Sequence, residues 1–467
     1  MPAVRNTAAR LALALTLAVS ACTLEPDYQR PAAPVAAAYP SADKVTGTSA
    51  DAIAWRSFFI DPRLKALIAL ALENNRDLRV AILNVEAAQA QYRVARAALL
   101  PTLDGIVSAR RSRTPADLSS LHRSTIGNSG DIVASAAWEI DLFGKNRSLS
   151  RAAIDRYLAT DEARKAAQIS LVAAVGDQYL TLLAYDEQLA VTRATVQTAT
   201  DSLALAKAQF DAGNQTALDL SEAETILDQA QANLAAQTRL RAEAEDALVL
   251  LLGAPIPAAL PPAQPFGRQN QMAEIPAGLP SDLLARRPDI RAAENTLKAA
   301  NADIGAARAA FFPSISLTGE YGTASSRLSG LFSANRAVWS FGPSVDIPVF
   351  AGGTNLANLS AAKAQKAISV AQYEKTVQTA FREVADGLAA RATYLDEVAA
   401  LTRDEQAQKT RLDLSTLRYR TGVDSYLPVL TAQNDLYAVQ ITLITTRLAR
   451  ASNQVNLYRA LGGGWRD

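Results

Sequence analysis

The sequence predicts a mainly α-helical chain that also carries four β-strands of membrane-crossing length and is built from two similar halves. Three observations favour this fold class. Long proline-free stretches place apolar residues at helical intervals, four shorter segments alternate apolar and polar residues, and short motifs recur about 210 residues apart. Apolar residues make up 49% of the chain but aromatic residues only 6%, a composition suited to long, closely packed helices.

The duplication rests on four motifs that occur in the same order in both halves. Their two copies are separated by 212, 207, 209 and 209 residues. Such close agreement is hard to obtain by chance, so we expect two structural repeats. The pairs are Ala97–Pro101 with Ala309–Pro313, Ile140–Phe143 with Ile347–Phe350, Phe210–Gly213 with Tyr419–Gly422, and Leu252–Gly253 with Leu461–Gly462.

The amino terminus has the layout of a secretory signal. Arg5 and Arg10 precede an apolar run over residues 11–19 that is too short to span a bilayer, which needs ~20 residues. Small residues then lead to Cys22, in a pattern that resembles a bacterial lipobox. We therefore expect cleavage before Cys22, diacylglycerol and an acyl chain such as palmitate on it, and no other cofactor. Thr23 is compatible with sorting to the outer membrane.

Proline-rich segments mark the expected linkers. Seven prolines crowd residues 254–280, where neither a helix nor a central strand could persist. The predicted organisation is a signal peptide (1–21), a lipid-anchored extended segment (22–61), a first repeat with a helix, two strands and a helical hairpin (62–253), a linker (254–280) and a second repeat (281–467).

Two long stretches without proline, 116–254 and 349–427, predict long helices. In the first, apolar residues recur at helical intervals from about residue 146 to 210. At ~1.5 Å per residue such a helix is about 100 Å long, more than a compact domain can hold.

Each long helix is expected to reverse at a glycine, because glycine accepts the left-handed backbone that ends a helix. Gly213 and Gly422 occupy these positions, and helices are predicted to return over about 218–252 and 425–461. Each half therefore supplies a helical hairpin. Alanine-rich faces would pack the two hairpins side by side as coiled coils.

Four segments have the period of a β-strand. They predict strands of about 10 to 12 residues, the length that crosses a bilayer at the tilt of a barrel strand. The match is weakest in the first of them. The segments are 103–110, 132–142, 314–321 and 339–349.

Four strands cannot close a membrane barrel. An open sheet has two edges, and each unpaired backbone group costs several kcal/mol in hydrocarbon. Two chains would supply eight strands and a filled interior, whereas three would supply twelve and a water-filled lumen. Helices of about 100 Å must then project from one side of the barrel, which makes a conduit. The alternative is a lipid-anchored coiled-coil spacer or adhesin whose sheet stays in water.

Charge and rare residues argue against other classes of protein. A net charge of +1 lacks the cationic surface of a nucleic-acid binder. One histidine and one cysteine exclude His/Cys zinc sites, iron-sulfur clusters and disulfide frameworks within one chain. An envelope hydrolase of the Ser-His-Asp type would have to use His122, which lies in a polar loop. We expect no catalytic and no metal-binding residues.

Several motifs together resemble the TolC family of outer-membrane efflux channels, in its lipidated branch that serves resistance-nodulation-division (RND) pumps. This resemblance implies a homotrimer in which a twelve-stranded β-barrel, four strands per chain, continues into a long α-helical barrel that reaches into the periplasm. It also implies a periplasmic adaptor protein, an inner-membrane RND transporter and the export of drugs and toxic compounds, hence multidrug resistance. The motifs are Asp27–Pro31, Leu279–Leu284, Arg286–Ile290, Tyr419–Asp424, Val455–Tyr458 and Leu461–Trp465.

The resemblance also implies a gate at the hairpin turns, where family channels close by ion pairs and hydrogen bonds. Arg418, Tyr419 and Arg420 occupy the basic and tyrosine positions, and Asp219 occupies the position of their acidic partner. Gly213, Gly422 and Val423 are then the tip residues that meet the adaptor.

The tip departs from the family pattern in one respect. Relatives place acidic rings one and two turns beyond the second glycine, where this chain has Pro428 and Thr431. Asp424 is the nearest remaining acid, and Leu427 is the expected apolar constriction. Closure is therefore expected to depend more on packing of Leu427 than on a cation-binding ring.

Overall fold

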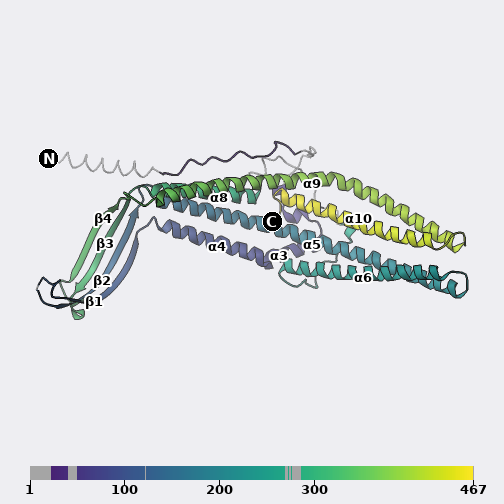
Figure 1. Ribbon diagram of the computed structural model, residues 1–467, viewed down its shortest axis with the longest axis horizontal. Helices are drawn as coiled ribbons and strands as arrows, with labels where there is room; N and C mark the ends of the chain where they lie inside the picture. The colour runs from purple at the N-terminus through teal and green to yellow at the C-terminus, as the bar shows by residue number, and fades with distance from the viewer. Residues whose placement is uncertain are drawn as a thin grey trace. The chain divides into compact units, whose positions relative to one another are not determined.

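The computed structural model describes most of the chain and divides it into two compact units (Figure 1). The sheet unit contains the described N-terminal residues up to Ala32, with 84–160 and 292–373; the helical unit contains 33–83, 161–291 and 374 onward. Each unit takes segments from both halves of the sequence. The predicted lipid site at Cys22 lies outside the described residues, which are 23–39, 50–120, 122–268, 272, 275 and 286–465.

The sheet unit holds one antiparallel sheet in the order β1-β2-β3-β4. The β2–β3 pairing joins the two halves of the sequence, and in it Ile140 lies opposite Ile315. Among the described residues, β1 and β4 each have a strand partner on one side only. The strands are β1 Thr102–Thr114, β2 Thr125–Ile140, β3 Ser314–Ser325 and β4 Ala337–Asp346.

The two faces of the sheet differ in polarity because successive side chains point to opposite faces. On the polar face Ser108 and Asp131 form a hydrogen bond of 2.5 Å, and two serines form another of 2.7 Å. The apolar face is exposed; Trp339, for example, is 76% exposed. A contiguous exposed apolar surface of this kind marks a site of interaction, either with a membrane or with another protein surface. The apolar face consists of Leu103, Val107, Trp138, Leu317, Tyr321, Trp339, Phe341 and Val345.

All four predicted strands are present, with changed ends. The weakest prediction, 103–110, corresponds to a strand of 13 residues. The predicted strand 339–349 ends at Asp346, which pairs with Ser314, the first residue of β3, so β3 offers no partner beyond that point.

Parts of four helices complete the sheet unit, and the N-terminal segment lies against them. Gly305 makes room for this segment, because a Cβ atom there would lie 3.0 Å from the Cα atom of Glu25. Arg151 pairs with Glu25 at 2.6 Å, and Arg30 pairs with Glu294 at 2.7 Å. The helices are α4 Arg76–Ala97, α5 Lys145–Asp211, α8 Pro288–Ala309 and α9 Thr354–Arg420, of which the sheet unit holds 84–97, 145–160, 292–309 and 354–373.

The helical unit contains the two predicted hairpins, and an aromatic cluster forms its core. The ring of Phe58 stacks on Tyr458 with centroids 4.0 Å apart, and both side chains are fully buried. Buried Tyr179 donates a hydrogen bond of 2.9 Å to Asp61. The hairpins are α5 with α6 (Ala217–Leu252) and α9 with α10 (Leu427–Ala460), and the short helices α2 (Trp55–Phe58) and α3 (Pro62–Asn74) complete the unit.

The break between α3 and α4 was not predicted. Asn75 leaves the helical conformation with ψ 130°. Its side-chain amide donates to the Leu251 carbonyl oxygen at 2.9 Å, and its side-chain oxygen accepts from the N–H of Leu78. Asn75 therefore starts α4 and ties it to the end of α6.

Asp177 on α5 should make the stability of the helical unit depend on pH. Burial raises the pKa of this carboxyl to about 6, although it accepts a hydrogen bond from Asn456. Because the pKa is above its unfolded value, folding takes up a proton between about pH 4 and 6, and stability falls as the pH rises through that range. The cost at pH 7 is as much as about 3 kcal/mol.

We therefore expect the thermal unfolding temperature to fall between pH 5 and pH 7.5, and Asp177→Asn to reduce this dependence. Asp228→Asn, at an exposed position of α6, is the matched control. An equal pH dependence in the Asp177→Asn variant and the parent protein would contradict the prediction.

Candidate functional sites: the hairpin tips and the strand-helix junction

Each hairpin of the helical unit ends in a turn (Figure 1), and the two turns have the same backbone conformation. Gly213 and Gly422 adopt φ values of 76° and 74°, the left-handed conformation that favours glycine. Each turn closes with the hydrogen bond of a Schellman motif. These bonds, both 2.9 Å long, join the N–H of Asn214 to the Gln209 carbonyl and the N–H of Val423 to the Arg418 carbonyl.

Asp219 caps a helix at the first tip. Its backbone N–H donates to the Thr216 side chain, while its carboxylate accepts from the Thr216 N–H at 3.1 Å, so the two residues form a capping box at the start of α6. The single chain does not bring Asp219 and Arg418 together. Arg418 contacts Asp424 at 2.5 and 3.0 Å, since the Gly422 turn brings these two side chains together. This pairing lowers the pKa of Asp424.

Tyr419 links the second hairpin to the first. Its hydroxyl donates to the side-chain oxygen of Gln209 at 2.6 Å and accepts from the side-chain nitrogen of Gln215 at 2.7 Å. Burial, with the nearby charge of Asp219, raises the pKa of its phenol. The ring also packs against Tyr426, with centroids 4.8 Å apart. Tyr419 therefore holds the hairpins together by both polar and apolar contacts.

An apolar cluster surrounds this link. It draws on all four long helices of the unit, so separation of the hairpins would expose apolar side chains to water. Its buried members are Ala206, Ala223, Tyr419, Tyr426, Val429 and Leu430, with Leu203, Ile226 and Leu412 packed against them.

The other predicted tip residues lie on the surface of the chain. Arg420, Val423 and Thr431 are exposed, and Leu427, the first residue of α10, is 54% exposed. The Thr431 hydroxyl donates to the Leu427 carbonyl at 3.0 Å. Val423 and Leu427 are thus free to contact other molecules.

Gln209, Gln215 and Tyr426 were missed by the sequence analysis. Gln209 lies one helical turn before Gly213 and Gln215 two residues after it, so their positions relative to the glycine were visible in the sequence. Their partner, Tyr419, is some 200 residues away, and no local pattern indicates that contact.

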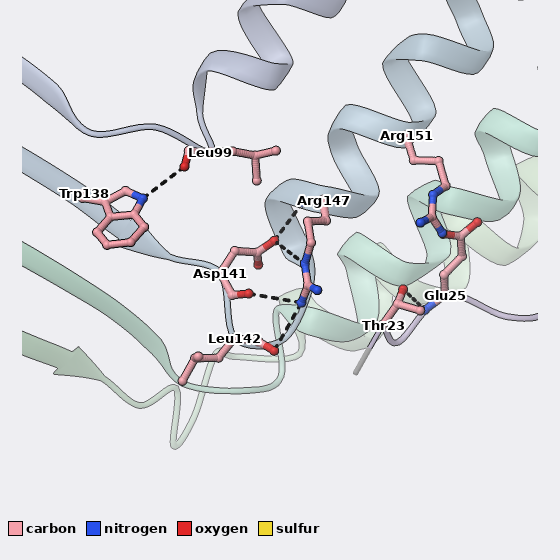
Figure 2. Close-up of polar contacts among 8 residues, drawn as sticks. All are labelled: Thr23, Glu25, Leu99, Trp138, Asp141, Leu142, Arg147 and Arg151. Carbon is pink, nitrogen blue, oxygen red and sulfur yellow. Dashed lines mark hydrogen bonds and ion pairs between the residues drawn. The ribbon is translucent and has the colours of Figure 1, made fainter. Parts of the chain in front are cut away.

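The strand-helix junction of the sheet unit is held by several polar contacts (Figure 2). The Trp138 indole donates to the Leu99 carbonyl at 3.1 Å. The backbone N–H of Arg147 donates to the Asp141 carboxylate at 2.8 Å, and its guanidinium donates to the Asp141 carbonyl at 3.2 Å. Figure 2 also shows Arg151 meeting Glu25 of the N-terminal segment. The direction in which α5 leaves β2 is therefore fixed.

Aromatic stacking joins the two sequence halves at the same junction. Phe143, after β2, stacks on Phe312, before β3, with centroids 4.8 Å apart and an interplanar angle of 21°. The residues at the corresponding positions after β4 and before β1 are Phe350 and Leu100, which are 90% and 64% exposed. One of two equivalent contacts is therefore formed within the chain.

Comparison with known protein families gives a match that fits this structure, which has a four-stranded sheet with an exposed apolar face and two paired hairpins. The model for the outer membrane efflux protein family matches residues 67–254 and 279–463. The chain belongs to this family. It is accordingly an outer-membrane efflux protein and not an enzyme, which removes the hydrolase hypothesis based on His122.

Known relatives and solved structures are similar to this chain over nearly its whole length. The solvent efflux pump outer membrane protein SrpC of Pseudomonas putida is 47% identical, with 96% of this chain and 97% of SrpC covered. A crystal structure of a membrane protein from Pseudomonas aeruginosa is 45% identical with a TM-score of 0.89, covering 94% of this chain and all of that one. The open state of the Neisseria gonorrhoeae MtrE outer membrane channel is 39% identical with a TM-score of 0.87, covering 95% and 99%.

Proposed function

We propose that this chain is the outer-membrane channel of a tripartite RND-type efflux system and works as a homotrimer. The observation that carries the proposal is the sheet with an exposed apolar face and with edge strands that, within the described part of the chain, lack a second partner. Three copies would join these edges into a twelve-stranded barrel with the polar faces inside. Their hairpins would form the α-helical barrel that continues it into the periplasm.

The channel is a passive conduit, opened at its hairpin tips by a periplasmic adaptor protein and an inner-membrane RND transporter. The exposed tip residues Gly213, Gly422 and Val423 support adaptor contact there. In the trimer, Leu427 forms the apolar constriction. Tyr419 holds each pair of hairpins in the closed arrangement, and the Arg418–Asp424 pair adds little because it is exposed to solvent.

The lipid on Cys22 would anchor each copy to the outer membrane. Thr23 begins the described segment, and Glu25 is held at 2.6 Å by Arg151 on α5 within the sheet unit. This contact holds the segment that follows the proposed anchor against α5. Cys22→Ala should abolish labelling by radioactive palmitate, whereas Thr23→Ala should not.

The proposed cargo is small, toxic organic molecules, namely solvents and drugs, by analogy with the solvent pump that contains SrpC. A strain lacking this chain should become sensitive to toluene and lipophilic antibiotics, and the gene on a plasmid should restore tolerance.

Native mass spectrometry of the purified protein should give three copies, and planar bilayers should show ion conductance. A monomer without conductance would support a lipid-anchored spacer or adhesin.

A further inference from the structure

The duplication within the chain provides a template for the contact between copies, an inference that rests on the proposed trimer. The β2–β3 pairing is the point at which the end of the first half meets the start of the second. In a closed ring, β4 and the β1 strand of the next copy meet in the same order and direction. The β2–β3 pairing within the chain therefore has a counterpart between copies, in which β4 of one copy pairs with β1 of the next. We call this pairing between copies the seam.

The template fixes the register of that seam. Ile140 lies opposite Ile315 in the β2–β3 pairing. The counterpart of Ile140 is Ile347, 207 residues later, and the counterpart of Ile315 is Leu103, 212 residues earlier. We infer that β4 of one copy pairs with β1 of the next copy so that Ile347 lies opposite Leu103, and Val345 opposite Gly105.

The polarity of the strands agrees with this register. It sets Val345 opposite Gly105 and Phe341 opposite Ala109, so the face of β1 that carries Leu103 and Val107 continues the apolar face of β4. A shift by one residue would set the apolar face of one copy against the polar face of the next. A shift by two residues keeps every side chain on the same face. An experiment therefore has to distinguish the inferred register from the two registers shifted by two residues.

Aromatic packing at the junction supports the same seam independently of the strands. Phe143 and Phe312 stack within the chain, whereas their counterparts Phe350 and Leu100 are 90% and 64% exposed. In the inferred seam, Phe350 covers Leu100 of the next copy. The contact would bury two apolar side chains that the single chain leaves in water.

Two carboxylates meet in this register. Asp346 lies opposite Asp104 of the next copy, and like charges directly opposite on neighbouring strands are destabilising. Asp104→Asn should therefore raise the temperature at which the trimer dissociates. In either register shifted by two residues, Asp104 would not face Asp346, and no such gain is expected.

Disulfide trapping tests the register directly, because Cys22 is the only native cysteine. Ser344 lies opposite Ile106 in the inferred seam, so Ser344→Cys with Ile106→Cys should give covalent trimers on mild oxidation. Ser344→Cys with Asp104→Cys and Ser344→Cys with Ser108→Cys are the matched pairs shifted by two residues, and both should give several-fold less covalent trimer. Each single-cysteine variant is a control for disulfide bonds that involve Cys22.

The outcomes separate the seam from the proposed function. Stronger trapping by a shifted pair would overturn the register. Absence of trapping in every pair, while native mass spectrometry still shows three copies, would overturn the seam and leave the proposed trimer standing. A monomeric parent protein would overturn the proposed function and this inference with it.

A thermodynamic cycle gives a second test that needs no cysteine. Phe350→Ala and Leu100→Ala should each lower the dissociation temperature of the trimer, and the double variant should lower it by less than the sum. Val349→Ala, at a neighbouring position that is 91% exposed, should be additive with Leu100→Ala. Additivity of Phe350→Ala with Leu100→Ala would contradict the contact.

Discussion

Tyr419→Phe combined with Arg418→Ser is expected to raise the single-channel conductance of the purified channel in planar bilayers. The phenylalanine removes both hydrogen bonds that join the hairpins, to Gln209 and Gln215. Each such bond contributes about 0.5 to 1.5 kcal/mol, so losing both should shift the opening equilibrium of one hairpin pair by roughly fivefold to a hundredfold. Three equivalent links would make the effect larger in the trimer.

The single variants should contribute unequally to that increase. Arg418 pairs with Asp424 across its own turn, so Arg418→Ser leaves the link between hairpins intact. Tyr419→Phe alone should therefore account for most of the increase. Tyr394→Phe with Arg403→Ser, the same changes on the same helix away from the tip, should leave conductance as in the parent. Unchanged conductance in Tyr419→Phe would remove Tyr419 from the proposed gate.

Elements with a local signal were predictable from the sequence. The period of 3.6 and the absence of proline placed the first long helix at 146–210, within one residue at each end of α5. Gly213 and Gly422 gave the turns, since a left-handed backbone is a local requirement. The capping role of Asp219 was also visible, as an acid three residues after Thr216.

Contacts between distant segments were not predictable in the same way. The α3–α4 break depends on Asn75 bonding to the end of α6, and the link through Tyr419 depends on glutamines of the other hairpin. Nothing in the neighbouring sequence distinguishes these side chains from ordinary polar residues on a helix surface. Only the fold brings the partners together.

Gly253→Ala is expected to destabilise the protein strongly, and more than the same change at other left-handed glycines. Gly253 ends α6 with φ 66°, and a Cβ atom there would lie 2.4 Å from the carbonyl oxygen of Asn74. The obstructing atom belongs to the backbone, so it cannot move aside as a side chain would. The left-handed conformation costs alanine about 1 kcal/mol, and the clash should add about 1 to 3 kcal/mol.

Two control glycines separate the cost of conformation from the cost of the clash. Gly213 has φ 76°, and apart from its chain neighbours no described residue has an atom within 4 Å of an added Cβ, so Gly213→Ala should cost only the conformational free energy of about 1 kcal/mol. Gly462 corresponds to Gly253 in the second half, yet its nearest atom, the Cα of Arg287, is 3.6 Å away, an ordinary contact. The thermal unfolding temperature of Gly253→Ala should therefore be well below those of Gly462→Ala and Gly213→Ala. Equal losses at all three positions would show that the Asn74 backbone yields, and that the α3–α6 contact is looser than its geometry indicates.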